Sequence, residues 1–101
     1  MNQERSSLFL MANLGSEVSR IISLKEKNDM VHVEESLTRA LHMIETIRRL
    51  PDMKKRGEEM SLLKQAIIDM AGAEPTLNVS SKHLTSYFLP FALRLLHSNT
   101  H

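Results

Sequence analysis

The chain has 101 residues, of which 42% are hydrophobic and 25% are charged, a composition typical of one ordinary globular domain over residues 1–101. Its formal net charge of +1 gives no overall field that would attract nucleic acid or an anionic membrane. The absence of cysteine excludes disulfides, thiolate metal sites and cysteine nucleophiles, and it fits the reducing cytoplasm, which is where we expect the protein. We expect no signal peptide and no membrane span, because the apolar run at residues 8–12 is too short.

The first half of the chain predicts two helices. Apolar side chains recur at three- and four-residue spacing over about residues 6–27, and the pair Asn28-Asp29 interrupts this pattern. A second stripe of the same kind covers about residues 30–50. It ends at Pro51, because proline disfavours the helical conformation in the residue before it.

The start of the third helix is open to two interpretations. Asp52 suits a helix N-cap, but the cations at 54–56 would then oppose the positive end of the helix dipole. The acidic pair at 58–59 suits that end. We therefore predict a third helix over residues 57–71, followed by a loop at 72–80 that contains glycine, proline and several polar residues.

A fourth helix is predicted over about residues 81–98, with Pro90 inside it. It carries two apolar faces. One face suits the core of the domain and the other lies almost opposite, so that a second partner is expected to cover it; a central position in a bundle is the alternative. The core face holds Leu84, Phe88, Phe91 and Leu95, and the second face holds Leu89, Leu93 and Leu96.

Helices joined by short turns pack as antiparallel neighbours. The predicted fold class is therefore all-α, as a four-helix up-and-down bundle or as helical hairpins exchanged in a dimer. No alternating pattern typical of a strand is present.

A polar seam is predicted beside the apolar stripe of the first helix. Glu17 falls on the shoulder of that stripe, with Arg20 three residues after it and Asn13 four residues before it. The seam is a candidate for partner recognition, and an acid or base role for Glu17 is an enzymatic alternative. The structural alternative is a salt bridge or hydrogen bond between helices that fixes their register. Gly15 and Ser16 in the same turn would let another helix approach closely.

A basic cluster lies at the turn after the second helix, and it holds five of the thirteen cationic residues. Such a density of cations is a candidate anion-binding site for RNA or a nucleotide. The alternative is a solvated turn, because cations are favoured at a helix C-terminus and no aromatic residue is interleaved for base stacking. The cations are Arg48, Arg49, Lys54, Lys55 and Arg56.

The sequence predicts no catalytic residue, no metal site and no cofactor. No serine lies in a recognisable nucleophile motif, and no glycine-rich phosphate loop follows a strand. His97 and His101 have the four-residue spacing of helical metal ligands, but they lie in the last residues of the chain, where fraying is expected.

The string Met-Ala-Asn-Leu-Gly-Ser-Glu at residues 11–17, within the segment 9–20, resembles the opening helix of a family of small bacterial and archaeal helical proteins. The segment 36–41, the basic turn and the helix near Glu58 are also similar, so the likeness covers about the first seventy residues. The segment 69–76 departs from the family pattern. The resemblance implies a bundle fold and a prokaryotic cytoplasmic setting, and it implies no activity.

Together these features predict a protein that works by association rather than by catalysis, most simply as a homodimer or with a helical partner protein. The surface expected to carry this association is the second face of the fourth helix, with the polar seam as a further candidate. An RNA- or nucleotide-binding domain that uses the basic cluster is the alternative.

Overall fold

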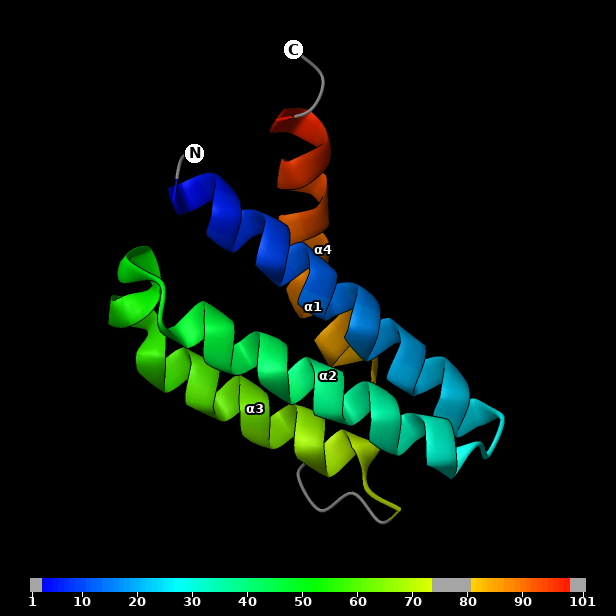
Figure 1. Cartoon of the computed structure of the whole chain (residues 1–101). Helices are drawn as coiled ribbons and strands as arrows, with labels where there is room; N and C mark the ends of the chain where they lie inside the picture. The colour runs from blue at the N-terminus through cyan, green and yellow to red at the C-terminus, as the bar shows by residue number, and fades with distance from the viewer. Residues whose placement is uncertain (1–2, 74–80, 99–101) are drawn as a thin grey trace.

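The computed structural model describes residues 3–73 and 81–98, which contain four α-helices, one 3-10 helix and no strand (Figure 1). The elements are α1 (Gln3–Glu26), α2 (Met30–Arg48), η1 (Pro51–Arg56), α3 (Gly57–Ala71) and α4 (Ser81–Ser98). The predicted all-α bundle is confirmed. No helix in the described ranges combines the length and apolar character that a membrane span requires. The predicted loop at 72–80 lies outside the described residues from residue 74 onward.

The helix boundaries agree with the predictions for α3 and α4, whereas α1 begins before residue 6 and α2 ends before residue 50. The sequence did not predict η1, and this element resolves the ambiguity at Asp52. Pro51 starts a separate short helix, and the cations at 54–56 lie in its last turn, where the dipole favours positive charge. The acidic pair at 58–59 then opens α3, so both charge clusters suit the helix ends that carry them.

A tight turn joins α1 to α2. Asn28 has a φ of 58°, in the left-handed region that asparagine tolerates better than most residues, and it reverses the chain after α1. Asp29 is the N-cap of α2 and accepts a hydrogen bond from the backbone nitrogen of His32 at 3.4 Å. The predicted interruption at Asn28-Asp29 is therefore a helix reversal.

Helices α1, α2 and α3 follow one another in alternating directions, as the colour order in Figure 1 shows. The Lys25 ammonium at the end of α1 donates to the carbonyl oxygen of Met70 and, at 2.9 Å, to that of Gly72. These carbonyls belong to the C-terminal end of α3, where a cation compensates both the unpaired oxygens and the helix dipole. Lys25 thereby fastens the end of α1 to the end of α3.

Helix α4 crosses α1 and extends past it, away from α2 and α3, in its C-terminal half (Figure 1). The crossing depends on Gly15, where a Cβ atom would lie 2.8 Å from the Phe88 Cβ and 2.9 Å from the Phe88 Cγ. Distances this short exclude any side chain larger than hydrogen without movement of α4. The predicted close approach at Gly15 is therefore confirmed, and the approaching helix is α4.

The core forms where the apolar stripes of all four helices and Met53 of η1 meet. Burial of these side chains supplies the main stabilisation of the fold. The fully buried large side chains are Met11, Leu14, Val18, Ile21, Val33, Ile44, Ile47, Met60 and Ile67.

Candidate functional site

The second apolar face of α4 is exposed in the structure. The exposed fractions are 55% for Leu89, 47% for Leu93 and 63% for Leu96. The opposite face of the same helix is buried in the core through Leu84, Phe88 and Phe91. The helix continues through Pro90, so the three leucines lie on one continuous helix at spacings of four and three residues. The two-faced character that the sequence predicts for this helix is confirmed for these residues. Leu95, which was also predicted on the core face, is only half-buried and lies outside the core cluster.

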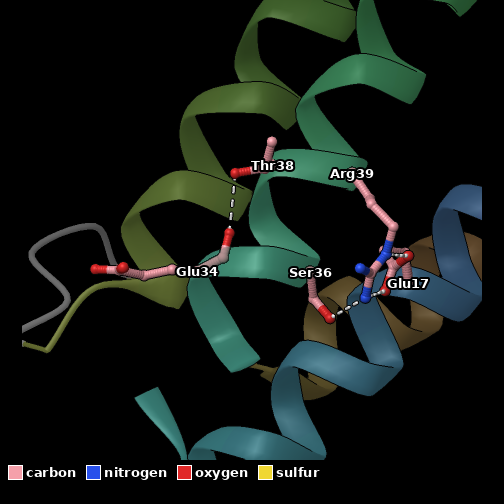
Figure 2. A network of polar contacts seen from close by, with 5 residues as sticks. All are labelled: Glu17, Glu34, Ser36, Thr38 and Arg39. Atoms are coloured by element: carbon pink, nitrogen blue, oxygen red, sulfur yellow. Dashed lines mark hydrogen bonds and ion pairs between the residues drawn. The ribbon is translucent and has the colours of Figure 1, made fainter. Parts of the chain in front are cut away.

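Glu17 of the polar seam forms an ion pair between helices. The Arg39 Nε of α2 donates to the Glu17 Oε1 at 2.8 Å, and Arg39 Nη2 donates to Ser36 Oγ at 3.0 Å (Figure 2). Ser36 is completely buried and the Glu17 side chain is only 10% exposed. The Arg39 guanidinium therefore connects α1 and α2 at the edge of their contact. The hydrogen bond to Glu17 raises the pKa of Arg39. The Thr38 hydroxyl, also drawn in Figure 2, donates to the carbonyl of Glu34 within its own helix.

The structure brings the three predicted seam residues together on one open groove of about 620 Å³. Asn13, Glu17 and Arg20 line this groove beside Arg39 and Met43. Within the part of the chain that the structure describes, Arg20 is exposed and makes no hydrogen bond or ion pair. The partner of Glu17 thus comes from α2 and not from the next turn of α1, and the pair matches the register-fixing alternative.

The basic cluster is divided by its intramolecular contacts. Arg48 pairs with Glu45 at 3.5 Å, and Arg56 pairs with Glu59. The other three cations, Arg49, Lys54 and Lys55, are exposed and form no ion pair among the described residues.

A network that the sequence did not predict joins η1, α3 and α4. Arg56 donates to the Glu59 carboxylate from Nε, at 3.1 Å, and from Nη2, and the Tyr87 hydroxyl donates to the same carboxylate. Hydrogen bonds from Arg56 lower the pKa of Glu59, whereas burial and the bond to Glu59 raise the pKa of Tyr87. The Arg56 guanidinium also lies 5.7 Å from the centre of the Phe91 ring. The three-residue spacing of Arg56 and Glu59 could have predicted their ion pair from the sequence. No residue near them in the sequence indicates that Tyr87 joins the pair.

The histidines with described positions do not gather into a metal site. Among the residues with described positions, no group of three or more histidine, aspartate and glutamate side chains is arranged to hold a metal ion. The His32 Nδ1 lies 2.6 Å from the Asp29 Oδ2, and this contact lowers the pKa of the Asp29 carboxyl. His97 is exposed on α4, and His101 lies outside the described residues.

Comparison with protein-family models, with curated proteins and with solved structures finds no match to this chain. The resemblance of the string at residues 11–17 to a prokaryotic family therefore stays a prediction.

Proposed function

We propose that this protein works by association with a second copy of itself through the exposed leucine face of α4, formed by Leu89, Leu93 and Leu96. The observation that supports this proposal is that the three side chains are 47–63% exposed on a helix whose opposite face is already in the core. Completing the burial of each leucine contributes about 1 kcal/mol, half of the value for full burial. Within the described part of the chain these leucines stay exposed, so a partner chain would supply this burial.

A second copy is the occupant that the geometry of the face favours. A straight stripe along one helix is self-complementary, because a two-fold axis places the same stripe of a second chain against it. Ala92 is also exposed, one residue before the central Leu93, and its small side chain permits close approach of the two helices. The net charge of +1 gives little long-range repulsion between copies.

The absence of cysteine permits a direct test of this contact. A Leu93→Cys variant carries one thiol at the middle of the leucine face, and a two-fold interface brings the two thiols together. We expect mild oxidation to yield a disulfide-linked dimer rapidly. Val31→Cys is the matched control, because Val31 is 69% exposed on α2 and lies outside this face. Equal cross-linking rates for the two variants would contradict the proposal.

A second candidate function is contact with RNA or a nucleotide through Arg49, Lys54 and Lys55, supported by their exposure and lack of ion pairs among the described residues. Such binding weakens steeply as salt rises. Retention on a polyanion resin at low salt should be lost when all three become glutamine. Retention that does not depend on salt, or no retention of the unmodified chain, would remove this candidate. The cytoplasmic setting is likewise part of the proposal, and the cysteine-free composition fits it.

A further inference from the structure

We propose that the cavity between α1, η1 and α4 binds a free α-amino acid with an apolar side chain. The cavity has a volume of about 360 Å³. This is near the lower end of small-molecule sites, which hold roughly 300–1,000 Å³, and it suits a small metabolite better than a large cofactor. The cavity lies on another side of α4 from the leucine face, so the inference is independent of self-association.

Three charged side chains line this cavity: the carboxylate of Asp52 and the guanidinium groups of Arg56 and Arg94. Asp52 and Arg56 both belong to η1 and both contribute to the wall, yet no ion pair joins them in the described structure. A ligand that carries both a cationic and an anionic group would satisfy the two together. An α-amino acid at neutral pH carries an ammonium and a carboxylate on the same carbon, Cα.

Each of these side chains keeps part of its hydrogen-bonding capacity for a ligand. The Asp52 Oδ2 accepts from the Ser7 hydroxyl at 2.6 Å, and the Oδ1 atom takes part in no hydrogen bond with described residues. Arg56 uses Nε and Nη2 for Glu59, and its guanidinium also interacts with the Tyr87 hydroxyl. Its Nη1 forms no hydrogen bond with the other cavity residues that the structure describes. The geometry assigns the ligand ammonium to Asp52 and the ligand carboxylate to Arg56.

The remaining wall is largely apolar, and Ser7 and Arg94 complete it. Met11, Met53 and Phe91 are buried in the core and contribute to the lining, as does the half-buried Leu8. Methionine side chains adjust their shape at little cost, so this wall can receive a branched aliphatic chain. The expected ligand class is therefore leucine and amino acids of similar size.

The test compares three probes of nearly equal shape by isothermal titration calorimetry with the unmodified protein. The probes are L-leucine, 4-methylpentanoate, which lacks the ammonium, and 3-methylbutylamine, which lacks the carboxylate. We expect leucine to bind at least about tenfold more tightly than either analogue, because each analogue forfeits one charged hydrogen bond. Absence of leucine binding would overturn the proposal, and so would equal binding of either analogue.

A conservative variant assigns the ammonium contact. Asp52→Asn removes the negative charge and keeps an oxygen that can accept from Ser7, so the fold should be retained. We expect it to weaken leucine binding by about tenfold and to leave 4-methylpentanoate binding unweakened. Glu26→Gln is the matched control, since Glu26 is exposed at the end of α1 and does not line the cavity. Equal leucine affinity of the two variants would contradict the assignment.

Discussion

Phe88 lies against the backbone of Gly15, so closely that a Cβ at Gly15 would lie 2.8 Å from the Phe88 Cβ. The contacting atoms are next to the α4 backbone and have no freedom to swing aside. This contact holds the inner face of α4 on α1 and turns Leu89, Leu93 and Leu96 outward. The close approach of α1 and α4 thus determines which leucines of α4 are exposed to a partner.

Gly15→Ala should destabilise the protein. The added methyl overpacks the α1–α4 contact at a cost of about 1–3 kcal/mol, which exceeds the gain of about 1 kcal/mol in helix propensity. Gly57→Ala is the control, because a Cβ at Gly57 meets nothing within 4 Å and its backbone is helical. That substitution should stabilise by about 0.5–1 kcal/mol. Urea denaturation measures the free energy of unfolding of both variants. A Gly15→Ala variant that is more stable than the unmodified chain would contradict the close contact of Gly15 with Phe88.

Glu17 should be energetically coupled to Arg39 and not to Arg20. A double-mutant cycle with Glu17→Ala and Arg39→Ala isolates the pair, since each single substitution removes the same ion pair. We expect a favourable coupling that shrinks as salt screens the exposed guanidinium. The parallel cycle with Arg20→Ala should show none. The reverse result would contradict the pairing of Glu17 with Arg39 across the two helices.

The stability of the protein should depend on Glu59 at acid pH. Arg56 and Tyr87 lower the pKa of Glu59 below its ordinary value of 4.5 in the folded chain. The stabilisation is therefore fully present above that value and is lost as the pH falls through the folded pKa. The difference in free energy of unfolding between the unmodified chain and Glu59→Gln should be constant near neutrality and decrease below about pH 4.5.

Glu58→Gln is the matched control for this titration, since Glu58 is exposed and forms no ion pair among the described residues. The difference in free energy of unfolding between Glu58→Gln and the unmodified chain should not decrease over the same acid range. A Glu59→Gln difference that persists unchanged at the acid end would show that the carboxylate charge contributes nothing to the network.

Much of the fold could be read from the sequence, because it depends on periodicity and on local turn chemistry. The bounds of α3, the two faces of α4 and the reversal at Asn28-Asp29 all follow from spacing within a few turns of helix. The short helix η1 could not be predicted, because it has six residues and only one of them, Met53, is buried. One buried side chain gives no hydrophobic periodicity.

The side-chain partners could not be read in the same way. Arg20 was the nearest cation to Glu17 along the helix, but the actual partner Arg39 is 22 residues away and is placed by the packing of α2. Tyr87 reaches Glu59 across 28 residues for the same reason. Such contacts depend on how helices cross, and helix periodicity leaves the crossing undetermined.

Sedimentation equilibrium from micromolar to millimolar protein tests the proposed association most directly. We expect the unmodified chain to have twice the mass of one chain, and Leu93→Glu to reduce it to one chain mass with an unchanged helical circular dichroism spectrum. Val31→Glu, which adds the same charge at an exposed apolar position of α2, should remain dimeric. An unmodified chain that stays monomeric throughout this range, or a dimer that Leu93→Glu leaves intact, would contradict the account.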